Sequence, residues 1–129
     1  MGNRADLAAV MPAMLLHEGH WQGWYRDFST DGALLDARRV KTWCEFPDDG
    51  PHHYIQHNWL TWETDRFAGH GWQTAEDVLM LRLDRRDVAD AYYIEMIVTA
   101  ADRRTRARTW QWFQGGLPWK WTLCNEERP

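Results

Sequence analysis

Turn-forming clusters divide most of this 129-residue sequence into short segments of similar length. Between the clusters, the segments are rich in the Val, Thr, Tyr, Phe and Trp side chains that favour β-strands. The clusters lie at 29–32, 47–51, 63–66, 73–77, 84–87, 100–103 and 115–116. No segment after residue 20 sustains the 3.6-residue periodicity of a helix. Seven turns separate eight strands, so the spacing predicts an all-β protein.

Eight antiparallel strands joined by short hairpins have one economical arrangement, the up-and-down barrel, which removes both edges of the sheet. Such a barrel encloses an interior just wide enough for packed side chains or one small ligand. A β-sandwich is the alternative, but its Greek-key connections need longer loops than this sequence offers. We expect a single lipocalin-like barrel domain over residues 1–129, with a helical N-terminal segment in 1–16 and the barrel in 17–129.

The overall composition has the balance of apolar and charged residues of an ordinary soluble protein, and we expect a cytoplasmic location from the absence of targeting signals. A net charge of -4 argues against nucleic acid as the main partner, and the basic run at 102–108 reads as a charged turn. No stretch is apolar enough to cross a membrane or to serve as a signal peptide. Cys44 and Cys124 are expected to be two buried thiols in a reducing compartment, although a disulfide is possible. We therefore expect neither a nucleic-acid nor a membrane partner.

Tryptophan is unusually frequent, with ten residues in the chain and four of them within 108–123. These four rings are mirrored about a Gly-Gly pair that is typical of a tight hairpin. A two-residue loop there places Trp112 opposite Trp119 and Trp110 opposite Trp121, and all four rings on one face. We expect this face to point into the barrel. The opposite face is mostly polar and is expected to face solvent: Thr109, Gln111, Phe113, Lys120, Thr122 and Glu126.

The preceding hairpin places an acidic residue among these rings. With its tip at 102–103, Glu95 lies opposite Trp110 and Ile97 lies opposite Arg108. Glu95 and Arg108 then become diagonal neighbours inside the barrel and form a buried charge pair. A slip of one residue is the alternative, and it would turn a more apolar set inward: Tyr92, Ile94, Met96 and Val98. We favour the register that pairs Glu95 with Trp110.

The segment at 52–62 brings amides to the interior. Its flanking prolines disfavour ladder pairing, so a five-residue loop at 47–51 is expected, with Cys44 opposite Tyr54. The inward set is then Tyr54, Gln56, Asn58 and Trp62. A buried amide without a partner costs about 1–3 kcal/mol. These amides must therefore bond to one another or to a ligand.

The first expected strand contains Gly19-His20-Trp21, a Gly-x-Trp that follows a short helix-like segment. This resembles the N-terminal signature of the lipocalin and calycin superfamily, antiparallel barrels that bind small apolar molecules. Extended through Gly23, the pattern is similar to that of nitrobindin and other small bacterial lipocalin-like domains. The resemblance implies that Trp21 packs at the closed end of the barrel and that an Arg from the last strands, Arg106 or Arg108, lies across it.

Signs of a cofactor or a metal are weak in this sequence. The resemblance to nitrobindin would require a haem-ligating His late in the chain, but the last one is His70. We expect the histidines to lie on the surface or in loops rather than around a metal: His17, His20, His52, His53, His57 and His70. The sequence has no Gly-rich phosphate loop and no spacing that recommends a Ser-His-Asp triad. We therefore expect no cofactor.

Three functions remain open. The leading hypothesis is binding of a small hydrophobic, ring-containing ligand inside the barrel. The second is a cofactor-free isomerase, cyclase or lyase, with Glu95 as acid or base and Tyr54, Gln56 or Asn58 donating to an oxyanion. The third is a filled barrel that dimerises through Trp59 or Trp43. The candidate site residues are Trp21, Tyr25, Tyr54, Gln56, Asn58, Trp62, Tyr93, Glu95, Arg108, Trp110, Trp112, Trp119 and Trp121.

Overall fold

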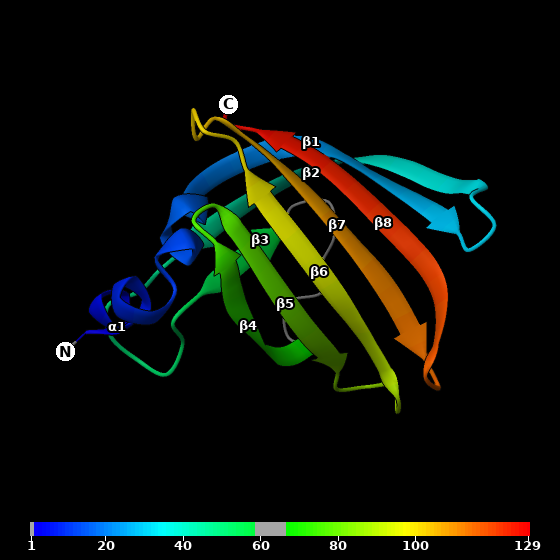
Figure 1. The fold of residues 1–129 in the computed structure, drawn as a ribbon, viewed down its shortest axis with the longest axis horizontal. Coiled ribbons are helices and arrows are strands. Elements are labelled where there is room, and N and C mark those ends of the chain that lie inside the picture. Colours follow the sequence, from blue (N-terminus) through cyan, green and yellow to red (C-terminus); the bar gives the residue numbers. More distant parts are fainter. Residues whose placement is uncertain (1, 59–66) are drawn as a thin grey trace.

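The computed structural model describes residues 2–58 and 67–129 (Figure 1). Two short helices begin the chain, α1 (Asn3–Val10) and the 3-10 helix η1 (Pro12–His17), and eight strands follow. The strands are β1 (Gly19–Ser29), β2 (Leu34–Glu45), β3 (Ile55–Asn58), β4 (Phe67–Ala75), β5 (Val78–Arg85), β6 (Ala91–Thr99), β7 (Thr105–Gln114) and β8 (Leu117–Glu127). Six of the seven expected turns separate strands as predicted, and the one at 63–66 lies outside the described residues.

The strands form one antiparallel sheet in the order β3-β2-β1-β8-β7-β6-β5-β4. Strands that follow one another pair within β1 to β3 and within β4 to β8, and β1 pairs with β8, so the first and last strands are neighbours inside the order. The sheet curls into a half-barrel (Figure 1). This confirms the expected all-β fold of eight antiparallel strands with a short N-terminal helix. Within the described residues, β3 and β4 are the two ends of the order.

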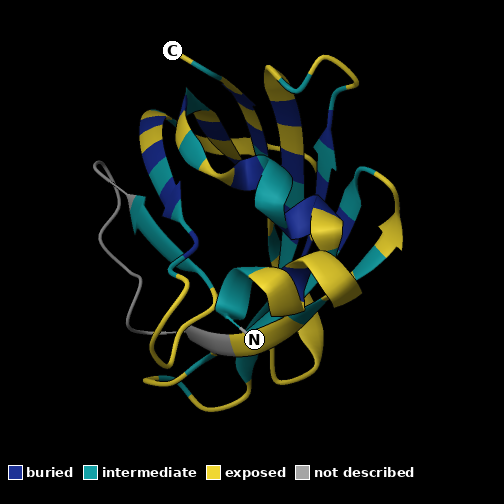
Figure 2. Cartoon of the chain, turned by 90° about the vertical axis from the view of Figure 1, so that its left-hand side faces the viewer, coloured by how far each residue is buried: buried dark blue, intermediate teal, exposed yellow. Residues whose placement is uncertain are grey.

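The N-terminal helical segment is interrupted where the sequence suggested one continuous stretch. Pro12 has no backbone N–H and disfavours the α-conformation at the residue before it. Met11 accordingly has φ -153° and ends α1, and a 3-10 helix starts at Pro12. Both helices lie at one end of the curled sheet (Figure 2). None of the helices in the described part of the chain is long and apolar enough to cross a membrane.

The β6–β7 ladder has the predicted register. Glu95 lies opposite Trp110, and Ile97 lies opposite Arg108. Glu95 and Ile97 are buried, whereas Met96 between them is 39% exposed. The alternation of buried and exposed residues is visible as bands along the strands (Figure 2). The alternative register, shifted by one residue, is therefore excluded.

The predicted β7–β8 register is wrong, because β8 contains a β-bulge next to the turn. Phe113 pairs with Pro118, but Trp112 pairs with Lys120, so Trp119 is an extra residue in β8. The extra residue reverses the faces of everything that follows it. Trp121 therefore lies on the outer face and is 40% exposed, whereas Trp119 at the bulge is 47% exposed and its ring lies 6.5 Å from that of Trp112. Residues that were expected to face solvent point inward instead: Lys120, Thr122 and Glu126.

The predicted β2–β3 register differs from the structure by two residues. Cys44 lies opposite Gln56 rather than Tyr54, because the loop before β3 is longer than expected. Side chains alternate with a period of two, so this shift leaves the faces unchanged. Asn58 pairs with Thr42 through its backbone, while its side chain and the whole of Trp62 lie outside the described part. The possible dimer contact Trp59 also lies outside it.

Candidate functional site

The inner face of the curled sheet carries an unusual number of buried polar and charged side chains. They come from η1, β1, β2 and the three strands β6 to β8: His17, Asp27, Thr42, Glu95, Thr99, Arg106, Arg108, Thr122 and Glu126. Taking an ion out of water costs several kcal/mol unless it is well paired. The ion-pair and hydrogen-bond partners of these side chains therefore determine which of them stay charged and which chemistry the interior allows.

Arg106 is the centre of the deepest part of this network. Its Nε donates to Glu126 Oε1 at 2.8 Å, and its Nη2 donates to Thr42 Oγ1 at 3.3 Å. The Thr42 hydroxyl in turn donates to Glu126 Oε2 at 3.1 Å. Burial alone would raise the pKa of Glu126, but Arg108 and Arg106 outweigh it and lower this pKa to about 2. Glu126 is therefore an ionised counter-charge for both guanidinium groups.

His17 completes the surroundings of Arg106, and its burial corrects the prediction of a surface or loop position. Arg106 Nη1 lies 2.8 Å from His17 Nδ1. Burial and the charge of Arg106 lower the pKa of His17 to about 2. The imidazole is therefore neutral, and Nδ1 accepts the hydrogen bond from Arg106. No periodic pattern signals this burial, because His17 is the last residue of the short helix η1 and meets Arg106 just before β1 begins.

Trp21 lies fully buried at the helix-covered end, as the resemblance implied. Its Nε1 donates to the His17 carbonyl oxygen at 3.0 Å. Arg106, rather than Arg108, lies across the ring at 4.4 Å from its centroid. Arg128 lies 4.1 Å from the same centroid and was not predicted. Cation–π contacts of this kind hold the ring in place, so Trp21 belongs to the closed end rather than to an open binding surface.

Arg108 lies farther along the same face, between two aromatic rings. Its guanidinium carbon is 5.3 Å from the Tyr25 centroid and 5.1 Å from the Trp110 centroid. Its Nε is 2.7 Å from Glu126 Oε1, but this N–H has no well-aligned acceptor. Nη1 donates to Glu95 Oε2 at 3.4 Å, and Nη2 donates to the Tyr25 hydroxyl. The predicted charge pair of Glu95 and Arg108 is confirmed.

The two partners on the Nη side of Arg108 are weak proton donors. Burial raises the pKa of Glu95, and Arg108 and Arg106 only partly oppose this. Burial likewise raises the pKa of Tyr25, so its hydroxyl stays neutral and accepts from Arg108. The Arg108 cation is therefore firmly matched by Glu126 on one side. On its other side Arg108 contacts Glu95, a carboxyl group whose raised pKa makes it easier to protonate.

A wall of aromatic rings extends from Arg108. Tyr25 packs edge-on against Trp110 at 5.1 Å between centroids, and Tyr93 lies 6.2 Å from Trp110 and 4.8 Å from Trp112. Trp110 is buried, whereas Tyr93 and Trp112 are only half-buried. Trp112 is oriented by a hydrogen bond from its Nε1 to Thr122 Oγ1 at 2.9 Å. The rings thus form a surface that leads from partly exposed side chains to a buried ion pair.

Tyr54 and Gln56 lie on the opposite side wall, next to β2. The Tyr54 hydroxyl bonds to the Gln56 side-chain oxygen and lies 3.5 Å from Cys44 Sγ. The amide of Gln56 therefore has a partner within the protein. Tyr25, rather than Tyr54, is the tyrosine that shares Arg108 with Glu95. Cys44 and Cys124 are both buried free thiols, as expected.

Other candidate features lie outside this inner face. His20 and His57 both stack on Trp43, at 5.5 and 4.8 Å, and His57 Nε2 lies 2.7 Å from Glu45 Oε2. Within residues 2–58 and 67–129, no group of three or more His, Cys, Asp or Glu side chains could hold a metal ion.

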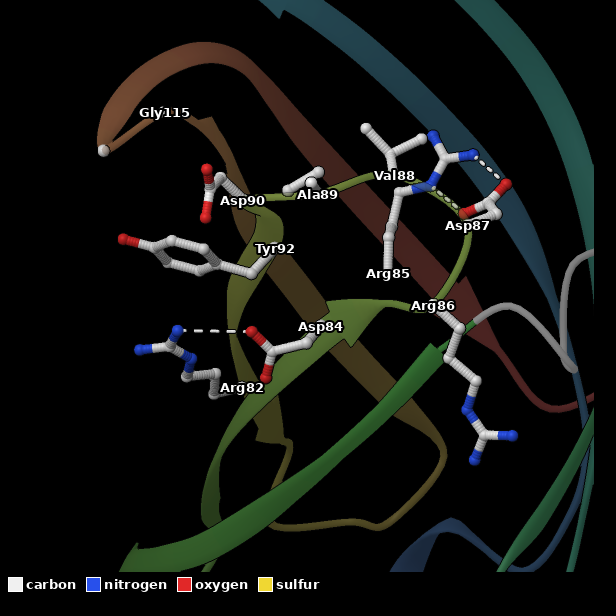
Figure 3. A pocket seen from close by; sticks show the side chains of 12 residues that line it. Arg82, Asp84, Arg85, Arg86, Asp87, Val88, Ala89, Asp90, Tyr92 and Gly115 are labelled. Carbon is white, nitrogen blue, oxygen red and sulfur yellow. Dashed lines mark hydrogen bonds and ion pairs between the residues drawn. The ribbon is translucent and has the colours of Figure 1, made fainter.

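A surface hollow lies between the 86–90 turn and the Gly-Gly turn of β7–β8 (Figure 3). Two ion pairs lie along it, Arg82 with Asp84 at 3.2 Å and Arg85 with Asp87 at 2.7 Å. None of the expected site residues lines it. The hollow is therefore separate from the buried network of the inner face.

No family model and no curated protein matches this chain. Its fold is similar to that of a protein of unknown function from the DUF3598 family of Nostoc punctiforme PCC 73102, with 12% identity and a TM-score of 0.57. The similarity covers 90% of this chain but 48% of the other, so the chain spans about half the length of that protein. At this identity the likeness shows the curled eight-stranded fold alone.

Proposed function

We propose that this protein is a lipocalin-like binder of a small, ring-containing apolar ligand, held against the inner face of its sheet. The observation that carries the proposal is the aromatic wall, on which the half-buried rings of Tyr93 and Trp112 lead to the buried pair of Arg108 and Glu95. Pockets for small molecules typically combine such apolar walls with a few polar groups that orient the ligand.

Packing alone accounts poorly for this interior. Replacing a buried ion pair by apolar side chains of similar volume is often neutral or stabilising. An interior built only for stability would therefore not need four charged side chains from three adjacent strands: Glu95, Arg106, Arg108 and Glu126. Ring surface left in water also forgoes about 25 cal/mol of stabilisation per Å². A ligand that covers Tyr93 and Trp112 would recover that free energy.

Two tryptophans of the same hairpin provide a matched test. Trp112 lies on the inner face and Trp121 on the outer face. The probe is 2-naphthylmethanol. Its own fluorescence is followed while wild type, Trp112→Leu or Trp121→Leu is added. We expect Trp112→Leu to weaken binding about tenfold, since lost ring contacts of about 1.4 kcal/mol have that effect. Trp121→Leu should bind like wild type. Equal affinities of the two variants, or no binding to wild type, would contradict the proposal.

The raised pKa of Glu95 supports a second candidate, proton transfer without a cofactor on the same class of ligand. A carboxylate in such a site can remove a proton from a bound ring, while Arg108 and the Tyr25 hydroxyl stabilise the resulting negative charge. Exchange of the C1 protons of 2-tetralone in D₂O, followed by NMR, tests this. We expect Glu95→Gln to slow the exchange by about 10²–10⁴-fold. If Glu95→Gln catalyses exchange at the wild-type rate, Glu95 is excluded as the base.

A further inference from the structure

We infer that the natural ligand carries a carboxylate, and that the site takes up one proton when this carboxylate replaces Glu95 as the partner of Arg108. The inference rests on the proposed ligand-binding function and names the chemical class of the ligand. It follows from the geometry around Arg108 and from the balance of charges on the inner face.

The ion pairs that Arg106 and Arg108 form with the buried carboxyl groups differ in length. Arg106 and Arg108 lie 2.8 and 2.7 Å from Glu126 Oε1, whereas Arg108 lies 3.4 Å from Glu95. The pair with Glu95 is thus the longest of the three. Nη1 makes this contact, and the neighbouring Nη2 donates to the hydroxyl of Tyr25, whose ring packs on Trp110 of the aromatic wall. A carboxylate at the end of a ring-containing ligand would meet Nη1 and the Tyr25 hydroxyl together.

The strands packed near Glu95 differ in the charge that they bring to it. The charged and titratable groups that face it in the described part are Arg106 and Arg108 from β7, Cys124 and Glu126 from β8, and Tyr25 from β1. On the other flank, β5 places Leu81 opposite Glu95. His17, which lies under Arg106, is neutral. Two guanidinium cations therefore face two carboxyl groups.

Of these groups, Glu95 is the one that can change its charge. Arg108 and Arg106 hold the pKa of Glu126 at about 2, and burial raises that of Cys124 to about 12, so neither titrates near neutral pH. Burial raises the pKa of Glu95. Two carboxylates beside one guanidinium cannot easily both stay ionised in a desolvated site. When a ligand carboxylate binds Arg108, Glu95 takes a proton from solvent and donates a hydrogen bond to the ligand.

The test compares two probes of the same shape, 2-naphthoate and 2-naphthylmethanol, between pH 7 and 9. The naphthoate carboxyl has a pKa of about 4 and is ionised throughout this range. We expect its dissociation constant to rise by up to about tenfold per pH unit, since one proton is taken up on binding. The alcohol should change less than about twofold. Calorimetry in phosphate and in Tris should report uptake of one proton for naphthoate.

Glu95→Gln should bind naphthoate without pH dependence and more tightly than wild type at pH 9, because no proton is then required. Glu127→Gln, at the exposed neighbour of Glu126, is the control and should behave like wild type. If the alcohol binds but naphthoate does not, or naphthoate binds without proton uptake, the inference is overturned while the proposed function stands. If neither probe binds, the proposed function itself fails.

Discussion

Arg106 brings a planar guanidinium into the interior, and its three nitrogens meet acceptors from three different elements. Nε contacts Glu126 of β8, Nη1 contacts His17 of η1, and Nη2 contacts Thr42 of β2. One side chain thus joins the N-terminal helices to strands on both sides of β1. The fixed fork of an Arg side chain suits this role, since a Lys ammonium is a point charge without planar donor geometry.

The neutral state of His17 makes the protein sensitive to mild acid. Its pKa is about 2 in the folded protein and 6.5 as an ordinary value, so only the unfolded chain is protonated between these limits. Stability is therefore complete above pH 6.5 and falls by about 1.4 kcal/mol for each pH unit below it. The lowered pKa of Glu126 adds a loss of the same sign only below about pH 4.5. The raised pKa of Glu95 acts in the opposite sense, so the effect of His17 is measured as the difference between wild type and His17→Gln in urea denaturation between pH 7 and 5.

His17→Gln keeps a side-chain oxygen that can accept from Arg106 but does not titrate. From pH 7 to 5 we expect this variant to lose about 2 kcal/mol less stability than wild type, whatever its value at pH 7, because the His17 loss of about 1.4 kcal/mol per pH unit below 6.5 is absent. His53→Gln, at a half-exposed histidine, should retain the slope of wild type. Parallel pH profiles for wild type and His17→Gln would show that His17 is not the acid-sensitive group.

At the scale of the strands, the backbones of β1 and β8 approach each other closely at Gly23. A Cβ atom on Gly23 would lie 1.8 Å from the backbone carbonyl oxygen of Asn125. We expect Gly23→Ala to destabilise the protein by about 3 kcal/mol, because one of the two strands must move. Gly32→Ala is the control: its φ is +91° but its Cβ would meet nothing within 4 Å, so a cost of about 1 kcal/mol is expected. Urea denaturation of both variants measures the difference, and equal losses would contradict this account of Gly23.

The two C-terminal hairpins show what can be predicted about strands from sequence. The β6–β7 register follows from the turn position and from alternation, since that ladder is regular. The β7–β8 register does not, because the bulge at Trp119 leaves no mark in the alternation of side chains. The proline beside the Gly-Gly turn, Pro118, is the available hint, since proline in a ladder tends to occur at bulges.

The candidate site was predicted only where its residues lie on adjacent strands. The pair of Glu95 and Arg108 follows from one hairpin register. Glu126 was assigned to solvent because it is charged and because of the missed bulge. Its burial makes sense only beside Arg106 and Arg108, and the register error had put Glu126 on the opposite face from them. Polar residues in an interior are recognised through their partners, and these partners depend on the complete fold.

At the scale of the whole molecule, the N-terminal helices cover one end of the sheet. Leu7 of α1 is buried in a cluster with Trp21, Phe46 and Leu79, whereas Val10 of the same helix is 77% exposed. We expect Leu7→Ala to cost about 2–5 kcal/mol, because it leaves a cavity between the helix and the sheet. Val10→Ala should change stability by less than about 0.5 kcal/mol. Thermal and urea denaturation report both values, and similar losses would mean that α1 does not pack as described.

The pairing of β1 with β8 has a consequence for how the chain folds during synthesis. Gln22 lies opposite Glu127, and Arg128 donates to the carbonyl oxygens of Leu16 and Glu18. A ribosome releases β1 long before it has made β8, and closing so long a loop carries a large entropic cost. The hairpins can form as they emerge from the ribosome, but the edge of β1 that pairs with β8 stays unpaired until β8 has been made. Contacts of this range make folding slow, so the sheet becomes complete only after translation has passed its last strand.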